Sequence, residues 1–338
     1  MTLRHMTNPK SQSLPGLPCE SGDPSVLGLR SSEQRVLISG WGLNGKKVRM
    51  EVSPGYPGAG IIFNNSIKAN VDNAKISGNC TCLKLHKRRV MTNPKSKILN
   101  PKSQSLPGLR SSVLGLPSSE QGVMMVEHFL AACYGLGLWD LMVEIHNWSL
   151  GICQFSDSQY LPFGDGSALE FVRAFCRAGL SNTDVETQDF VSLRAPVKVR
   201  SGKRFIVAFP ASRLRINCLI DYPFVGRQFF SAVMTRNLFV KELAPARTFG
   251  RYRRSTDGET QDLVSLLEKR LGYRLKREGA WVFPKRLRFK NEFCRHKTLD
   301  LLGDLALLGR PLMAEIFAFN PGHRLNLALV RKITELEA

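Results

Sequence analysis

Residues 293–308 read FCRHKTLDLLGDLALL, and this stretch anchors the interpretation of the whole chain. Its leucines recur at intervals of three and four residues, which predicts an α-helix that buries one face. His296, Asp300 and Asp304 stand four residues apart, so they project in one row on the same side of that helix. An imidazole and two carboxylates beside a leucine seam are costly to desolvate unless a charged group lies against them. A divalent metal is therefore the first interpretation to test.

The size and composition of the chain indicate a globular protein. It has 338 residues, of which 43% are hydrophobic, and this length predicts two domains with sizeable cores. No apolar run reaches the roughly 18 residues that cross a bilayer, and the first residues, MTLRHMTNPKSQS, lack the hydrophobic segment of a signal peptide. We therefore expect a cytoplasmic protein.

The charge of the chain is its unusual global property. The formal net charge is +20, which attracts polyanions such as nucleic acid, an anionic lipid surface or a phosphorylated substrate. Aromatic residues are not interleaved with the basic residues in an RNA-binding signature. An RNA-binding module is therefore an alternative that rests on bulk charge alone.

A repeated segment marks the irregular parts of the chain. The run that begins MTNPKSQSLPGL at Met6 returns, almost word for word, as the run that begins MTNPKSKILNPKSQSLPGL at Met91. Residues 1–34 are rich in Ser, Pro, Gly and Leu and predict a poorly ordered leader. The second copy predicts an inserted surface loop at 91–123, because a long loop costs little further entropy once it is closed.

The remaining residues predict an α+β protein with two similar domains, 35–187 (domain I) and 188–338 (domain II). In the first, glycine- and proline-punctuated hairpins precede a helix at 124–134, a strand at 138–148 and a helix at 167–180. In the second, alternating strands precede a short helical stretch, the helix at 293–308, and a final strand, turn and helix. Because both halves run from strands into helices, we expect each domain to be a β-sheet layered on helices.

A third metal ligand has to come from outside the 293–308 helix. Catalytic zinc takes three protein ligands and keeps a fourth position for water, and His296 and Asp300 supply two. Glu127 and His128 are the best candidates for the rest, because they place a base and a ligand side by side at a predicted helix. Taken alone, however, His128 is more often a satisfied core or surface histidine.

Two further segments have residue types that suit catalysis. His323 follows Pro-Gly at the predicted start of a helix, where an imidazolium is disfavoured but Asp304 could restore it. The alternative is a simple cap residue. Arg247-Thr248-Phe249-Gly250 is a turn-like motif in which the Thr248 hydroxyl could donate to an oxyanion.

Five short motifs occur together and in a known order. They are VEH at 126–128, DGSA at 165–168, ARTFG at 246–250, RHKTLDLLGDL at 295–305 and GHRLN at 322–326. With CTCL at 80–83 and GWGLNGKKV at 41–49, they resemble the UDP-3-O-acyl-N-acetylglucosamine deacetylase family, the zinc amidases of lipid A synthesis. The resemblance covers residues 35–338 apart from the insertion, and it implies two α+β domains with the active site between them.

The resemblance also implies the metal centre and its base. In such enzymes the residues that match His128, His296 and Asp300 hold Zn²⁺. The glutamate that matches Glu127 is the general base for the attacking water. This fits the chemistry of zinc, which lowers the pKa of water to about 7.

Other roles follow from the same resemblance. His323 would be the protonated group that helps the amine leave, oriented by Asp304, and Thr248 would help to hold the tetrahedral oxyanion. Lys297 and Phe249 would contact the substrate. The implied partner is a UDP-linked acylated glucosamine. We expect no nucleic acid partner and a monomer that can make peripheral contact with the inner membrane face.

A second alternative is a catalytically impaired paralogue that still binds nucleotide-sugar, because the chain departs from the family pattern in two places. The family has a histidine after Gly-Leu in its glycine-rich hairpin, where this chain has Asn44. The family also commonly has a Gly-Gly-Ser and Asn-Ala segment, and none occurs between Arg251 and Leu287.

Overall fold

The computed structural model describes residues 35–43, 45–78, 80–84, 122–147, 159–180, 189–223, 225–251, 268, 274–278 and 281–337. The expected leader, the expected domain boundary at 187/188, Asn44 and residues 91–121 of the expected insertion lie outside these residues. Gly122 and Val123, which end the expected insertion, are buried in strand β7 (Gly122–Met124). These two residues therefore belong to the core.

The first layer is a five-stranded sheet in the order β1-β2-β8-β3-β4. Its strands are β1 (Val36–Trp41), β2 (Lys47–Pro54), β8 (Leu141–Asn147), β3 (Ile61–Phe63) and β4 (Ile67–Lys68). Side chains alternate along β2, so that Val48, Met50 and Val52 are buried while their neighbours are more exposed. Helices α1 (Glu127–Leu136) and α2 (Leu169–Arg177) pack against one face of this sheet. The Phe129 ring of α1 lies 5.7 Å from the Phe63 ring of β3.

A smaller sheet, β5-β6-β7-β9, leads into α1. It contains β5 (Ala74–Ser77), β6 (Cys80–Lys84), β7 and β9 (Gln159–Tyr160). Between β7 and α1 the backbone of Met125 takes a φ of 60°, a left-handed conformation that is uncommon for a residue other than glycine. The backbone nitrogens of Met125 and Val126 both donate to the Thr81 oxygen of β6. These contacts fix the first turn of α1 on the small sheet.

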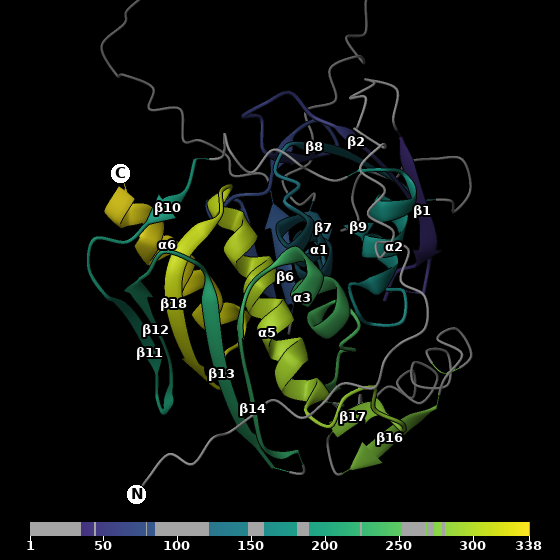
Figure 1. The fold of residues 1–338 in the computed structure, drawn as a ribbon. Helices are drawn as coiled ribbons and strands as arrows, with labels where there is room; N and C mark the ends of the chain where they lie inside the picture. Colours follow the sequence, from purple (N-terminus) through teal and green to yellow (C-terminus); the bar gives the residue numbers. More distant parts are fainter. Residues whose placement is uncertain are drawn as a thin grey trace, which may run out of the picture.

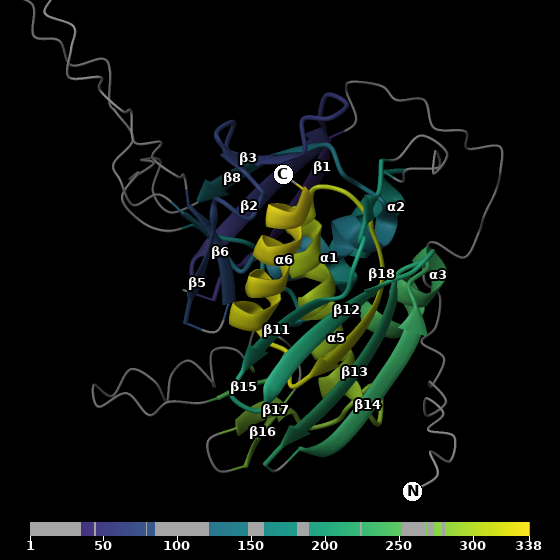
Figure 2. The ribbon, with the colours of Figure 1, turned by 90° about the vertical axis from the view of Figure 1, so that its left-hand side faces the viewer.

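The second large sheet has the order β11-β12-β18-β13-β14, with β10 (Val191–Ser192) beside the start of β18. Its other strands are β11 (Val197–Ser201), β12 (Arg204–Pro210), β18 (Leu312–Phe319), β13 (Arg215–Tyr222) and β14 (Gly226–Val233). Helix α5 (Glu292–Leu305) packs against β13 and β14, whereas α6 (His323–Glu337) packs against β11 and β12. Figures 1 and 2 show α1 and α5 between the two large sheets.

Two parts of this half are absent from the sequence prediction. A short α-helix, α3 (Arg236–Leu238), continues into a π-helical turn, η2 (Phe239–Leu243), after β14. A three-stranded sheet, β15-β17-β16, is formed by β15 (Gly250–Arg251), β17 (Trp281–Pro284) and β16 (Leu275–Glu278). Neither segment has the long apolar period that makes an element recognisable in a sequence.

Helix α5 is confirmed, but the expectation that it buries only one face is wrong. Apart from Lys297, every residue from Glu292 to Leu305 is buried, and the 3₁₀ turn η3 (Ala306–Leu308) follows. The helix lies against α1, α6, β13 and β14, so its polar side chains face other protein groups instead of water. The α+β class, with sheets layered on helices, is confirmed.

Candidate metal and catalytic site

Three buried side chains meet where α1 crosses α5. They are His128 from the first turn of α1 and His296 and Asp300 from successive turns of α5, and one potential ligand atom from each lies within 4.8 Å of the others. The Nε2 atoms of His128 and His296 lie 3.6 Å and 3.2 Å from Asp300 Oδ1. The structure thus brings together the three residues that the sequence singled out as ligands.

The protonation of His296 suits a ligand. Its Nδ1 lies 3.0 Å from the carbonyl oxygen of Ala246, which can only accept, so Nδ1 carries the proton and Nε2 presents a lone pair to Asp300. Burial lowers the pKa of His296 to about 3, against the opposing effect of Asp300. The ring is therefore neutral at physiological pH, as metal binding requires.

The two oxygens of the Asp300 carboxylate have different surroundings. Its Oδ2 accepts from Lys297 Nζ at 2.6 Å, but its buried Oδ1 has no hydrogen-bond partner among the described residues. Burial would raise the pKa of Asp300, but the His296 ring in its protonated form and the Lys297 ammonium outweigh burial and hold this pKa well below 3.8. A buried carboxylate oxygen that lies 3.6 Å and 3.2 Å from two imidazole nitrogens is an arrangement that a bound cation would stabilise. The donor set, two nitrogens and one oxygen, fits a divalent transition metal.

Glu127 lies beside this cluster at the start of α1. Its Oε2 accepts from the Thr81 backbone nitrogen at 3.2 Å, and its Oε1 lies 3.7 Å from His323 Nε2. Burial raises the pKa of Glu127, with His323 and His128 opposing the rise. A carboxyl group with a raised pKa is better able to take a proton near neutral pH.

His323 begins α6, as the sequence predicted, and pairs with Asp304 of α5. Its Nδ1 lies 2.8 Å from Asp304 Oδ2, and its Nε2 faces Glu127. Burial would lower the pKa of His323, but Asp304 and then Glu127 raise it to about 9. The ring therefore holds a proton at neutral pH and presents Nε2–H toward Glu127. Asp304 is a support for His323, although it stands in one row with His296 and Asp300.

Two residues that complete this support were missed in the sequence. The Thr81 hydroxyl of β6 donates to Asp304 Oδ1 at 2.6 Å, and Asn326 Nδ2 of α6 donates to Asp304 Oδ2 at 2.8 Å. Thr81 lies in the CTCL motif and Asn326 in the GHRLN motif. The sequence signal that could have identified them is therefore a polar side chain inside each of these motifs. Their donors satisfy the carboxylate so that it stays ionised and correctly oriented.

The remaining predicted site residues are Thr248 and Phe249, which lie in the segment 246–250, and Lys297, which lies in α5. Thr248 is held through its backbone nitrogen, which donates to Gly166 at 2.7 Å, and its side chain is half-buried. The Phe249 ring is only 9% exposed and lies 6.2 Å from the His296 ring. Lys297 Nζ lies over Phe249, 5.5 Å from the ring centre. Among the described contacts, Thr248 itself does not touch His128, His296 or Asp300, whereas its neighbour Phe249 lies beside His296.

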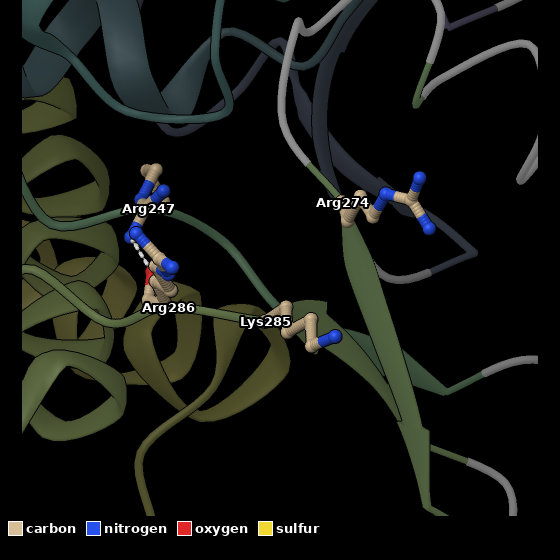
Figure 3. Close-up of a pocket in the computed structure, with 4 residues that line it drawn as sticks. All are labelled: Arg247, Arg274, Lys285 and Arg286. Carbon is tan, nitrogen blue, oxygen red and sulfur yellow. Dashed lines mark hydrogen bonds between the residues drawn. The ribbon is translucent and has the colours of Figure 1, made fainter.

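A basic cavity of about 420 Å³ lies apart from this cluster. Arg247, Arg274, Lys285 and Arg286 line it, and Figure 3 shows the side chains of Arg274 and Lys285 pointing away from Arg247. The Arg247 guanidinium is already held by Glu292, with Nε 2.8 Å from Oε1. Because these cations do not converge on one point, we assign the chemistry to the buried cluster and not to this cavity.

None of the helices among the described residues has the length and apolarity that a bilayer-spanning helix needs.

Comparison with known proteins gives one family. Residues 97–335 match the family model for UDP-3-O-acyl N-acetylglycosamine deacetylase. A relative from Chlamydia abortus, named UDP-3-O-acyl-N-acetylglucosamine deacetylase, is 35% identical over 224 residues, which cover 63% of this chain and 73% of the relative. A protein of the same name from Chlamydia pneumoniae is 30% identical over 320 residues, covering 90% and 96%. Another, from Trichormus variabilis, is 36% identical over 226 residues, covering 64% and 75%.

Proposed function

The chain belongs to the UDP-3-O-acyl-N-acetylglucosamine deacetylase family, and from that membership we propose a zinc-dependent mechanism carried by the cluster around Asp300. The protein is a hydrolase that acts on an amide bond: it removes the N-acetyl group from UDP-3-O-acyl-N-acetylglucosamine in lipid A biosynthesis. The resemblance drawn from the motifs is confirmed, and neither the RNA-binding nor the impaired-paralogue alternative is favoured.

Family members are metalloenzymes, and we propose Zn²⁺ as the metal and His128, His296 and Asp300 as its ligands. The unpartnered Oδ1 of Asp300, facing two imidazole nitrogens, is the observation that carries this assignment. When bound, zinc would polarise the amide carbonyl and make water a stronger acid. Two neutral imidazoles and one carboxylate leave part of the zinc charge uncompensated, which suits both effects.

Glu127 is the proposed general base. As a water oxygen attacks the carbonyl carbon of the acetyl group, Glu127 takes the proton that the water loses. Its buried carboxylate is oriented by the Thr81 backbone nitrogen at 3.2 Å. General bases of this kind contribute about 10² to 10⁴-fold to the rate.

His323 is the proposed general acid. The carbon–nitrogen bond breaks as the imidazolium gives its Nε2 proton to the departing glucosamine amine, and acetate is the other product. Glu127 Oε1, 3.7 Å from Nε2, is placed to return the proton taken from water. Asp304 then stabilises the imidazolium for the next cycle.

Three residues complete the proposed site. The Thr248 hydroxyl would donate to the developing oxyanion, and Lys297 and Phe249 would contact the substrate. The Lys297 ammonium already donates one hydrogen bond to Asp300 Oδ2 at 2.6 Å. Because an ammonium has more than one N–H donor, another of them would contact the substrate.

The arrangement of the protein is part of the same proposal. We propose domain I at 35–187 and domain II at 188–338, so that His128 comes from one and His296 and Asp300 from the other. The enzyme would act as a monomer in the cytoplasm and touch the inner membrane face, because its substrate has an acyl chain.

Metal analysis with a coupled acetate-release assay tests the proposal. Purified protein is expected to hold about one zinc ion per chain and to release acetate from UDP-3-O-acyl-N-acetylglucosamine. Protein that retains its zinc after Asp300→Ala would overturn the ligand assignment. Zinc-loaded protein that releases no acetate would overturn the catalytic roles.

A further inference from the structure

The outer face of the second large sheet is rich in exposed apolar side chains. Along β12 and β18 alternate residues point away from α5 and α6, and on both strands these include phenylalanines. Phe209 is 41% exposed and Phe317 is 42% exposed. Their rings meet edge to face with centres 6.0 Å apart. Large apolar side chains that cluster in solvent mark interaction surfaces more often than isolated ones do.

The apolar side chains continue across the sheet in register. Phe205 of β12 lies opposite Phe319 of β18, Phe319 lies opposite Leu219 of β13, and Leu219 lies opposite Phe229 of β14. Each of these four residues is half-buried and belongs to the same face as Phe209 and Phe317. Four neighbouring strands therefore present one continuous apolar row. Figure 2 looks onto this face, with β12, β13 and β14 in front of α5.

Cations surround this row. Seven exposed lysine and arginine residues lie on the outer face or at the turns that bound it: Lys198, Arg200, Lys203, Arg204, Arg213, Arg215 and Arg227. Two carboxylates accompany them. Glu315 lies 3.9 Å from Arg215, and Asp221 lies 2.8 Å from Arg227. The face thus has a clear excess of positive charge around an apolar centre.

From this pairing of exposed aromatics with surrounding cations, we propose that the outer face of the β11-β12-β18-β13-β14 sheet docks on an anionic lipid bilayer. Lysine and arginine side chains near an anionic leaflet strengthen its attraction for the protein. The central phenylalanines would enter the zone between head groups and acyl chains, where aromatic rings are favoured. The choice of lipid as the partner rests on the proposed function, because the substrate of that function has an acyl chain. The apolar and cationic character of the face is observed independently of that function.

The geometry of the aromatics favours lipid over single-stranded RNA. Bases stack on ring faces that are open to solvent. Here the Phe209 and Phe317 rings are inclined at 85° and pack against each other, and the row continues through the aliphatic Leu219. Packed rings and aliphatic side chains suit an acyl boundary and offer little to a base.

Vesicle co-sedimentation tests the proposal with the full-length protein. The protein is expected to sediment with phosphatidylcholine vesicles that contain phosphatidylglycerol and at least about tenfold less with phosphatidylcholine alone. Phe209→Ser with Phe317→Ser, and separately Lys198→Glu with Arg200→Glu, are each expected to weaken binding to the anionic vesicles by about tenfold or more. All four side chains lie on the outer face, away from the buried cluster, so acetate release from a micelle-dispersed substrate should stay unchanged. The unfolding temperature should stay unchanged in the cation variant and fall only slightly in the phenylalanine variant, which loses the Phe209–Phe317 contact.

Two matched controls use the first half of the chain. Tyr56→Ser removes an aromatic ring that is 84% exposed, and Lys68→Glu with Lys75→Glu makes the same change in net charge as the cation variant. Both controls should bind anionic vesicles as the unchanged protein does. Equal losses in the controls, or no vesicle binding by the unchanged protein, would overturn the proposal. So would tight binding of an RNA oligonucleotide that the Phe209/Phe317 variant loses. Failure of acetate release with vesicle binding intact would count against the proposed function alone.

Discussion

A Cβ atom built on Gly303 of α5 would lie 2.0 Å from the backbone oxygen of Glu127 in α1 and 3.2 Å from the backbone nitrogen of Ala131. The two helices therefore touch backbone to backbone close to the place where His128, His296 and Asp300 meet. This contact sets how closely His128, on α1, approaches His296 and Asp300, on α5. Any side chain at position 303 would push the first turn of α1, which includes His128, away from His296 and Asp300.

We predict that Gly303→Ala destabilises the protein and weakens metal binding. In an unconstrained helix the change would stabilise by about 1 kcal/mol. Here backbone atoms of α1 would have to move, and overpacking of this kind costs about 1 to 3 kcal/mol, occasionally more. A displacement of about 1 Å at the catalytic groups can also lower the rate on the order of a hundredfold. Chemical denaturation, zinc content and acetate release measure the three effects.

Gly250→Ala is the matched control, because a Cβ on Gly250 meets no atom of the described residues within 4 Å. Its stability and activity are expected to stay close to those of the unchanged protein. A Gly303→Ala protein that is as stable and as active as the control would contradict the packing argument.

A second prediction separates metal ligands from the base. His296→Ala and Asp300→Ala should lose both zinc and activity, because each removes one of three ligands. Glu127→Gln should keep zinc but lose about 10² to 10⁴-fold in kcat, because the amide cannot accept the proton from water. Metal analysis and kcat on the same preparations decide the assignment. Loss of zinc in Glu127→Gln would mean that this carboxylate also holds the metal.

Thr81 is predicted to act as a positioning residue for His323. Its hydroxyl donates to Asp304 Oδ1 at 2.6 Å, and Asp304 in turn holds His323. Thr81→Val keeps the side-chain volume but leaves a buried carboxylate oxygen short of a donor, so kcat is expected to fall by roughly tenfold to a hundredfold, for an unmet bond of about 1 to 3 kcal/mol. KM should change little, because no substrate contact is removed.

Thr81→Ser supplies the control for that change, since it restores the hydroxyl and should restore kcat. Zinc content should be equal in the two variants. If the serine variant is as slow as the valine variant, the effect comes from packing of the threonine methyl group and not from the hydrogen bond.

The grouping of His296 with Asp300 could be predicted from the sequence because it follows a local rule. The four-residue spacing of His296, Asp300 and Asp304 places them in one row whatever surrounds the helix. The spacing by itself does not separate Asp304 from the other two residues; its pairing with His323 was expected from the Pro-Gly-His segment and from the family resemblance, and the two side chains do lie together. The spacing also does not reveal that α5 is buried on nearly all sides.

Other features depend on contacts between distant residues. Thr81 and Asp304 are 223 positions apart, and no spacing rule connects them. The importance of Gly303 was equally hidden, because a glycine inside a helical pattern reads only as a weak helix former. The strand order of the two large sheets likewise depends on pairing between distant strands, such as β3 with β8. The sheet class could be predicted, because it needs only alternation along each strand.

Asp165 and Arg288 join the DGSA turn to the segment that precedes α5, and their ion pair predicts how stability depends on pH. Arg288 Nη2 lies 2.6 Å from Asp165 Oδ2, and Ser167 donates to Oδ1 through its backbone nitrogen at 3.0 Å and its hydroxyl at 2.5 Å. Burial would raise the pKa of Asp165, but Arg288 and Ser167 outweigh it and lower this pKa below 3.8. A carboxyl group with a lowered pKa in the folded state stabilises the fold above its unfolded pKa. That contribution is lost as the pH falls from 3.8 through the folded pKa.

Asp165→Asn removes this dependence. At neutral pH the variant is expected to be less stable by about 1 to 3 kcal/mol, the range for hydrogen bonds to a charged group. The difference should stay constant down to about pH 5 and shrink below about pH 4, where Asp165 takes up a proton in the unfolded chain before it does so in the folded protein. Urea unfolding at a series of pH values measures both curves. A difference that stays the same at acid pH would show that Asp165 stabilises the turn through its shape and not through its charge.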